Sequence, residues 1–335
     1  DTDLTITEIA FASGFGSVRQ FNRACLEIFR GTPRELRARR RRSDRLAADG
    51  GLALRLPLSA PLDWDAALAY FGPRLIAGVE AIEGDVYRRT IVVDGDPGVL
   101  ELSPGGPDHL VLRAHLPHWE GLIHIVEGAR RIVNLDEDVA AGAERLRGDP
   151  VIGPLIEARP DLPIPGTWDP FEVGIRAIVG QQVSVAGAST MIGRLAHRHG
   201  TAVPGLEGLE LTHTFPAPEV LADADLGGIG LTGARERAIR AFAAGVATGE
   251  LRLDRSTRLE ELVEAITAIP GLGPWTAHYI ALRMGERDAF PATDLGLRRA
   301  LGRLEPASEL LTPSARAEPW RPWRALAAVY LWFGA

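Results

Sequence analysis

The sequence has one cysteine, no lysine and no long apolar run, and each absence excludes a class of protein. With Cys25 alone, the chain cannot form an internal disulfide, a four-cysteine iron–sulfur cluster or a multi-cysteine zinc site. No stretch approaches the roughly 20 apolar residues that span a bilayer, and the opening residues DTDLTITEIA do not resemble an export signal. We therefore expect a cytoplasmic protein without a membrane partner, in which Cys25 is a buried packing residue. The spacing of the histidines at 109, 115, 118 and 124 is irregular, so we expect no metal site.

Charge is distributed unevenly along the chain. The formal net charge is −7, but residues 1–45 hold 10 arginines against 6 acidic residues, whereas the remainder holds 27 arginines against 38. All 37 basic residues are arginine. The basic N-terminal part suits nucleic acid, whose phosphates attract such side chains. The acidic remainder has to bind DNA by other means if it binds DNA at all.

Composition shifts and turn signals divide the 335 residues into four segments. Residues 1–42 predict short helices around the turn SGFGS, which suit either a helix-turn-helix or a small helical hairpin with a basic tail. Residues 43–52 are expected to be a linker. Residues 53–162 predict an antiparallel sheet with flanking helices, and residues 163–335 predict an all-α domain. The expected fold class is therefore α+β, with strands near 77–83, 86–94, 98–103 and 109–116.

The stretch IPGLGPWTAHYIALR joins two helical patterns through a turn rich in glycine and proline. Thr257 and Glu260 predict a capping box at the start of the first helix. Gly271 and Gly273 permit backbone conformations closed to other residues, and Pro274 suits the first position of the second helix. The expected helix–hairpin–helix offers N–H groups at the positive end of a helix, which bind a phosphate without any basic side chain.

The stretch FPATDLGLRRAL places Asp294 at the start of a further helix. Taken alone, an aspartate in this position is most often an ordinary helix-capping residue. Because it follows the hairpin by about twenty residues, it becomes a candidate functional carboxylate, and the helix N-terminus favours its ionised form.

Together these motifs resemble the helix–hairpin–helix DNA glycosylase superfamily, with its Gly/Pro-rich loop and catalytic aspartate. The stretch DPFEVGIRAIVGQQVSVAGASTMIGRL resembles the opening of the same domain. The stretches LRLPLSAPLDWDAALAYFGPR and RPWRALAAVYLWFG are similar to the 3-methyladenine DNA glycosylase II branch of bacterial alkylation repair, so the resemblance covers about residues 52–335. Residues 1–42 resemble the second helix-turn-helix of an AraC-type regulator. This implies a truncated adaptive-response fusion protein that begins within a longer chain.

The resemblance implies a role for each matching residue. Asp294 is the expected catalytic carboxylate, which stabilises positive charge at the sugar. Trp275, Tyr279 and Trp332 are expected to form an aromatic pocket for a cationic base, and Gln182 is the expected wedge in the DNA stack. No cofactor is expected, apart from a monovalent cation held by carbonyls of the hairpin. The expected phosphate-binding residues of the hairpin are Gly271, Leu272, Gly273 and Thr276.

The implied function is that of a monofunctional DNA glycosylase acting in base excision repair. Such an enzyme, here expected to be a monomer at the nucleoid, flips an alkylated purine of the 3-methyladenine type from double-stranded DNA and leaves an abasic site. Relatives that also cut the strand use a lysine at the place that aligns with Trp275, and this chain has none. Two alternatives are an AraC-type transcription regulator with a ligand-sensing domain and a bifunctional glycosylase/AP lyase. The sequence does not rank 3-methyladenine, 7-methylguanine and deaminated or etheno bases as substrates.

Overall fold

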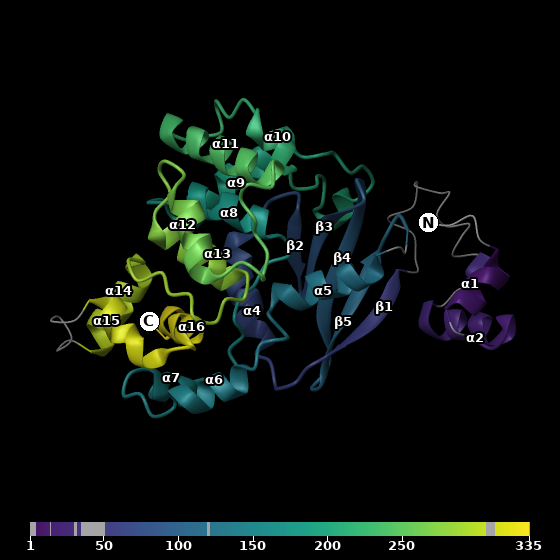
Figure 1. Cartoon of the computed structure of the whole chain (residues 1–335), viewed down its shortest axis with the longest axis horizontal. Coiled ribbons are helices and arrows are strands. Elements are labelled where there is room, and N and C mark those ends of the chain that lie inside the picture. The colour runs from purple at the N-terminus through teal and green to yellow at the C-terminus, as the bar shows by residue number, and fades with distance from the viewer. Residues whose placement is uncertain are drawn as a thin grey trace.

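A helical pair, a five-stranded antiparallel sheet and an array of helices follow one another along the chain (Figure 1). The predicted antiparallel sheet and helical region are thereby confirmed, while the four segment boundaries stay predictions. The computed structural model describes residues 5–13, 15–29, 32–34, 51–118, 121–305 and 312–334.

The N-terminal pair consists of α1 (Ile6–Ala12) and α2 (Val18–Phe29), which pack against each other. Ala10 and Cys25 are 0% and 4% exposed, which confirms that Cys25 is a buried packing residue. Of the predicted linker at 43–52, only the last two residues lie within the described part of the chain.

The sheet has the strand order β1–β5–β4–β3–β2, and every neighbouring pair is antiparallel. The register places Leu102 opposite both Tyr87 and Leu112, so that apolar side chains of three strands lie on one face. The strands are β1 (Leu52–Pro57), β2 (Glu80–Glu83), β3 (Val86–Val93), β4 (Asp96–Gly106) and β5 (His109–His115).

Two helices cover this apolar face of the sheet. These are α4 (Trp64–Phe71), followed by the short 3-10 helix η1 (Gly72–Arg74), and α5 (Leu122–Ile132), which lies in front of the strands in Figure 1. Asp63 caps α4 by accepting a hydrogen bond from the Ala66 N–H at 2.8 Å, and this fixes where the helix begins. The buried residues that join α4 and α5 to the sheet include Trp64, Tyr70, Phe71, Ile125, Ala129 and Ile132.

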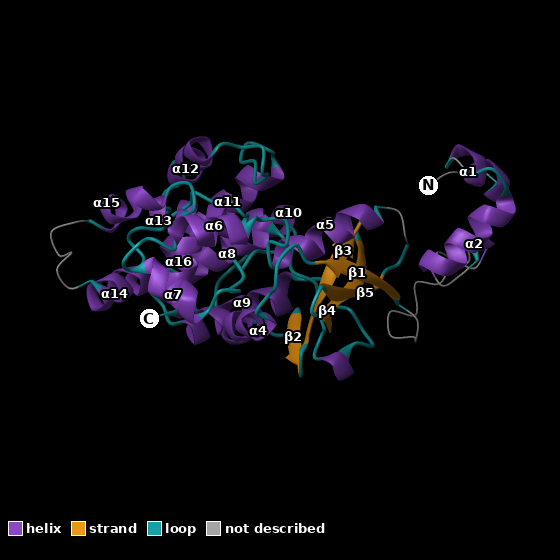
Figure 2. Ribbon diagram, turned by 90° about the horizontal axis from the view of Figure 1, so that it is seen from below, coloured by secondary structure: helices purple, strands orange, loops and turns teal. Residues whose placement is uncertain are grey.

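Most of the remaining helices form the second part of the molecule and lie to one side of the sheet (Figure 2), whereas the residues around the short helix η2 pack on the sheet itself. The core of this second part is built around α8 and α16, whose residues are almost all buried. Over the described ranges, no helix is both long and apolar enough to cross a membrane. The helices are α6 (Val139–Leu146), α7 (Ile152–Ala158), α8 (Pro170–Gly180), α9 (Val185–His199), η2 (Glu207–Leu209), α10 (Pro218–Ala222), α11 (Gly233–Ala247), α12 (Leu259–Thr267), α13 (Pro274–Arg283), α14 (Leu295–Leu304), α15 (Pro313–Ala317), η4 (Glu318–Trp320) and α16 (Arg324–Phe333).

The capping box predicted at the start of α12 is wrong. The N-cap is Arg258, which makes no side-chain capping bond. Thr257 instead donates through its hydroxyl to Asp254 at 3.3 Å, and the same carboxylate accepts from the Ser256 N–H at 2.9 Å. The hydroxyl of Thr257 is therefore bonded to the local turn at Asp254 and does not cap α12.

Candidate active site

The turn between α12 and α13 is shaped by two glycines. Gly271 has a φ of 93°, in the left-handed region that favours glycine, and Gly273 precedes Pro274 at the start of α13. The Leu272 side chain is buried and anchors the turn in the core. The N–H groups of Gly271 and Gly273 have no hydrogen-bond partner among the described residues. Unpaired N–H groups at the start of a helix are the donors that a phosphate accepts from.

The loop that follows α8 is tied to this turn by Gln181. Its Nε2 donates to the carbonyl of Gly271 at 3.2 Å and to the hydroxyl of Thr276 at 3.0 Å, and Arg235 donates to the Gln181 carbonyl. The next residue, Gln182, is exposed and has a φ of 55°. This left-handed conformation costs a residue other than glycine about 1–2 kcal/mol. The Gln181 anchor therefore holds Gln182 beside the hairpin in a strained conformation.

Asp294 lies at the N-cap of α14, and hydrogen bonds fix both of its carboxylate oxygens. Oδ1 accepts from the Leu297 N–H at 3.0 Å and from the indole of Trp332 at 3.0 Å, and Oδ2 accepts from the indole of Trp275 at 2.9 Å. Gly296 makes room for this arrangement, because a Cβ there would lie 3.0 Å from Asp294 Oδ1 and 3.3 Å from the Trp332 ring. The carboxylate is thus half-buried and held at one orientation.

Three aromatic rings surround this carboxylate. Trp275 and Tyr279 are one helical turn apart on α13 and stack with their ring centroids 5.4 Å apart and their planes at 16°. Trp332 on α16 meets the edge of Tyr279 at 6.2 Å and 61°. Electron-rich faces in these two orientations suit a flat, electron-poor ligand.

The carboxylate and the three rings line one cavity of about 570 Å³. The sequence predicts all four of these residues as site residues, and the structure brings them together. Of the predicted hairpin residues, Leu272 and Thr276 have buried side chains. A ligand at this turn therefore meets backbone groups rather than these two side chains. The exposed Gln182 lies just outside the cavity lining, between the lining residues Gly180 and Val183.

Sequence reasoning missed a polar cluster that lines the same cavity. The hydroxyls of Tyr70 and Tyr279 are 3.2 Å apart, and one amino group of Arg283 donates to both, at 3.3 and 3.1 Å. Arg283 is one turn beyond Tyr279 on α13, and this spacing was a signal that could have found it. Tyr70 comes from α4, more than 200 positions earlier, and no local pattern indicates it.

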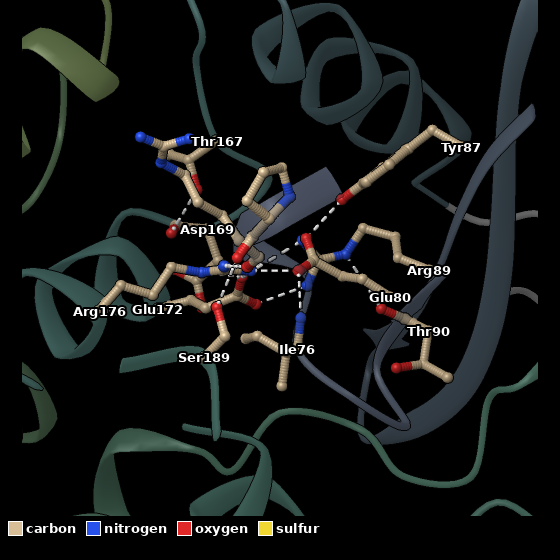
Figure 3. A network of polar contacts seen from close by, with 12 residues as sticks. Ile76, Glu80, Tyr87, Arg89, Thr90, Thr167, Asp169, Glu172, Arg176 and Ser189 are labelled. Atoms are coloured by element: carbon tan, nitrogen blue, oxygen red, sulfur yellow. Dashed lines mark hydrogen bonds and ion pairs between the residues drawn. The ribbon is translucent and has the colours of Figure 1, made fainter. Parts of the chain in front are cut away.

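A buried network of charges that lines the same cavity joins the sheet to α8 (Figure 3). Glu80 on β2 and Glu172 on α8 each pair with both Arg89 on β3 and Arg176 on α8. The Arg89–Glu172 contact is 2.5 Å and the Arg176–Glu172 contact is 2.8 Å. Burial alone would raise the pKa of Glu80, but the charges of Arg176 and Arg89 outweigh it and lower the pKa to about 2. The network fixes α8, and hence the loop that carries Gln182, against the sheet.

Asp169, the N-cap of α8, lies beside this network (Figure 3) and accepts a hydrogen bond from the Phe171 N–H at 2.9 Å. Burial and the neighbouring charge of Glu172 raise its pKa to about 6. Within the described ranges, no group of three or more histidine, cysteine, aspartate or glutamate side chains is placed to hold a metal ion.

The fold and site define a helix–hairpin–helix protein with a carboxylate inside an aromatic cavity, and comparisons with known proteins agree. Residues 53–169 match the AlkA N-terminal domain family, and residues 175–325 match the HhH-GPD superfamily of base excision DNA repair proteins.

Named relatives narrow the class, and one solved structure shows the same fold. A Mycobacterium tuberculosis protein described as a probable bifunctional transcriptional activator/DNA repair enzyme AlkA is 38% identical over 99% of this chain and 67% of its own length. The Escherichia coli DNA-3-methyladenine glycosylase 2 is 30% identical over 82% of this chain and 94% of its own. A 3-methyladenine DNA glycosylase structure from Archaeoglobus fulgidus superposes with a TM-score of 0.73 at 23% identity, covering 84% of this chain and 97% of that one.

The chain therefore belongs to the AlkA branch of the HhH-GPD superfamily. This confirms the superfamily, the branch and the function as a DNA glycosylase in base excision repair that the sequence predicts. DNA is its partner.

Proposed function

We propose that this DNA glycosylase flips alkylated purines of the 3-methyladenine type out of double-stranded DNA and hydrolyses their glycosidic bond, leaving an abasic site. The observation that carries the proposal is the position of Asp294, fixed by two indoles within the aromatic cavity. The name of the Escherichia coli relative, a DNA-3-methyladenine glycosylase, supports this substrate class.

The chemistry follows from the charges involved. Alkylation of a ring nitrogen makes the base cationic, so it leaves readily and stacks favourably on Trp275, Tyr279 and Trp332. As the bond breaks, positive charge develops on the sugar. The fixed carboxylate of Asp294 stabilises that charge and orients the water molecule that attacks the sugar.

Two further elements act on the DNA rather than on the bond. The N–H groups of Gly271 and Gly273 bind a backbone phosphate, and this explains how an acidic domain binds DNA. Gln182 fills the gap left by the flipped nucleotide, which fits its exposed position on an anchored loop. No cofactor takes part. A monovalent cation can support the hairpin, since the carbonyls of Ile269 and Gly271 each accept one hydrogen bond and keep a second lone pair.

The proposed enzyme is monofunctional. Strand cleavage by this superfamily needs a lysine that attacks the sugar and forms a Schiff base. The chain contains no lysine, and the family resemblance aligns Trp275 with the position of that lysine. We therefore propose base release without a nick, by a monomer that works on the nucleoid in the cytoplasm.

For residues 1–42 we propose a partial AraC-type helix-turn-helix, in which α2 is the helix that enters the major groove. The support is the pair α1 and α2 with a short turn between them. The name of the Mycobacterium tuberculosis relative, which includes a transcriptional activator and which matches over 99% of this chain, also supports it.

The test is Asp294→Asn, assayed on methylated duplex DNA for free bases and for nicks separately. Asparagine still caps α14 but has no negative charge, so excision should fall on the order of 100- to 1,000-fold while DNA affinity is kept. Asp138→Asn is the matched control, because Asp138 caps α6 in the same way outside the cavity lining. Full activity of Asp294→Asn contradicts the catalytic role, and nicks made by the wild type contradict monofunctional action.

A further inference from the structure

The loop that presents Gln182 is a tight turn of four residues, from Gly180 to Val183. The Val183 N–H donates to the carbonyl of Gly180 at 3.4 Å and closes the turn. Gln181 has a φ of −56° and a ψ of 121°, and Gln182 has a φ of 55°. A type II β-turn has about −60° and +120° at its second residue and a positive φ at its third, so this turn is of type II. The third position of such a turn usually holds glycine, whereas here it holds Gln182.

The same four residues can close a turn without strain. Type I differs from type II by a rotation of the central peptide, which brings ψ of the second residue to about −30° and φ of the third to about −90°. Glutamine adopts these angles readily, so the local sequence alone favours type I. A contact from outside the turn must therefore hold the central peptide, which joins Gln181 to Gln182, in its type II orientation.

Arg235 on α11 makes that contact. One amino group of its guanidinium donates to the carbonyl of Gln181, which is the carbonyl of the central peptide. Rotation of this peptide to type I would turn the oxygen to the opposite side of the turn and break the bond. Because the donor is a cation, the bond is stronger than one between neutral groups, and it offsets the left-handed strain at Gln182.

The hairpin holds the same residue through its side chain. Gln181 Nε2 donates to the Gly271 carbonyl at 3.2 Å and to the Thr276 hydroxyl at 3.0 Å. The helix α11 also packs on the hairpin, since a Cβ on Gly271 would lie 3.8 Å from the Cβ of Ala238, one turn beyond Arg235. The direction of the Gln182 side chain is therefore set by the hairpin and α11, and not by the sequence of its own turn.

We propose that Arg235 is a positioning residue, which selects the type II turn and thereby directs the Gln182 side chain into the DNA stack. This inference rests on the role of Gln182 as the wedge in the proposed function. In a type I turn the φ of Gln182 is negative, so its Cα–Cβ bond points in another direction. Glycine at this position would need no arginine to hold the turn, but it has no side chain to insert into DNA.

Urea unfolding tests the turn itself, without DNA. The series compares wild type, Gln182→Gly, Arg235→Met and the double variant, since methionine keeps an unbranched side chain and removes the donor. Gln182→Gly should raise the urea midpoint when Arg235 is present, because glycine relieves the left-handed strain. Without Arg235 the turn relaxes to type I, and the same glycine should give no gain. A gain of equal size in both backgrounds overturns the inference and leaves the proposed function standing.

Single-turnover release of a methylated base at saturating enzyme tests the wedge. Arg235→Met should slow excision by about tenfold or more, because the wedge is misplaced. The further loss caused by Arg235→Met should vanish in the Gln182→Gly background, where no side chain is left to direct. Arg235→Lys should recover most of the rate, because the bond uses a single amino group and an ammonium also donates to a carbonyl.

Arg240→Met is the matched control. Arg240 lies on the same helix and donates to a backbone carbonyl, that of Ala224, at 3.1 Å, so the variant loses the same charge and the same kind of bond away from the turn. It should excise at the wild-type rate. An equal loss in Arg240→Met and Arg235→Met overturns the inference.

The remaining outcomes separate this inference from the proposed function. Wild-type excision by Arg235→Met at saturating enzyme, with weaker DNA binding as its defect, would make Arg235 a phosphate contact and overturn the inference. Wild-type excision by Gln182→Gly removes the wedge and the inference with it, while base release still supports the glycosylase function. If the wild type releases no methylated base, the proposed function fails and the inference fails too.

Discussion

The indole of Trp275 donates to Oδ2 of Asp294 at 2.9 Å, although the two residues are 19 positions apart. Trp275 stands in the first turn of the helix that leaves the hairpin, so the element proposed to bind phosphate also sets the orientation of the carboxylate. Trp332 holds the other oxygen. Because each oxygen has a partner, the carboxylate cannot rotate without losing a charge-assisted hydrogen bond.

Trp275→Phe tests the value of this bond. The variant keeps an aromatic ring and removes the donor to an ionised group, a loss of about 1.5–3 kcal/mol, so single-turnover excision should fall by roughly 10- to 150-fold. Trp320→Phe is the matched control, since that indole donates to Asp149 at 2.8 Å outside the cavity lining. The control should lower the melting temperature without slowing excision per folded molecule. An equal loss of excision in both variants would show that the bond to Asp294 has no special role.

Gly296→Ala tests whether the carboxylate needs its present position. The added Cβ would lie 3.0 Å from Asp294 Oδ1 and 3.3 Å from the Trp332 ring, so one of these groups has to move. Excision should fall by about tenfold or more, because small displacements of catalytic groups are costly. Gly302→Ala, in the same helix, places its Cβ in open space and should leave excision unchanged. Both variants should gain helix propensity of about 1 kcal/mol, and wild-type rates in Gly296→Ala would contradict the prediction.

Gln182→Gly should separate stability from activity at the proposed wedge. Glycine adopts the φ of 55° without strain, so the free energy of unfolding in urea should rise by about 1 kcal/mol. Excision from duplex DNA should fall, because nothing fills the gap left by the flipped base. Gln182→Ala should be slow in excision without the gain in stability. Undiminished excision by both variants would remove Gln182 from the role of wedge.

Asp169→Asn should stabilise the protein at neutral pH and not in acid. The pKa of Asp169 is raised from 3.8 to about 6 in the folded state, so the folded state binds the proton more tightly, and stability falls as the pH rises from 3.8 to about 6. Asparagine caps α8 equally well and carries no charge, so its advantage should grow over that interval to at most about 3 kcal/mol. Urea unfolding at a series of pH values measures it. A gain that is constant with pH would rule out this cause.

The local parts of the site could be predicted from the sequence. The hairpin, its glycines and the capping position of Asp294 depend on residues a few positions apart, and turn and capping rules act at that range. The aromatic residues were predicted through the family resemblance, which supplied the long-range pairing that spacing does not contain.

The parts that depend on contacts between distant segments could not be predicted. Tyr70 reaches the cavity because α4 packs against the sheet, and the sequence around it indicates only a helix. The Glu80–Arg176 ion pair joins residues 96 positions apart. The capping box predicted at Thr257 is wrong for a local reason instead. The hydroxyl of Thr257 donates to Asp254, three positions earlier, and so does not cap the helix.

The position of Tyr70 bears on how this enzyme can change over evolution. It comes from the segment that matches the AlkA N-terminal domain, whereas Asp294 comes from the segment that matches the HhH-GPD superfamily. The two segments therefore line one cavity together, and neither encloses it alone. A substitution on α4 can therefore change the walls of this cavity without altering Asp294 or the two indoles that hold it.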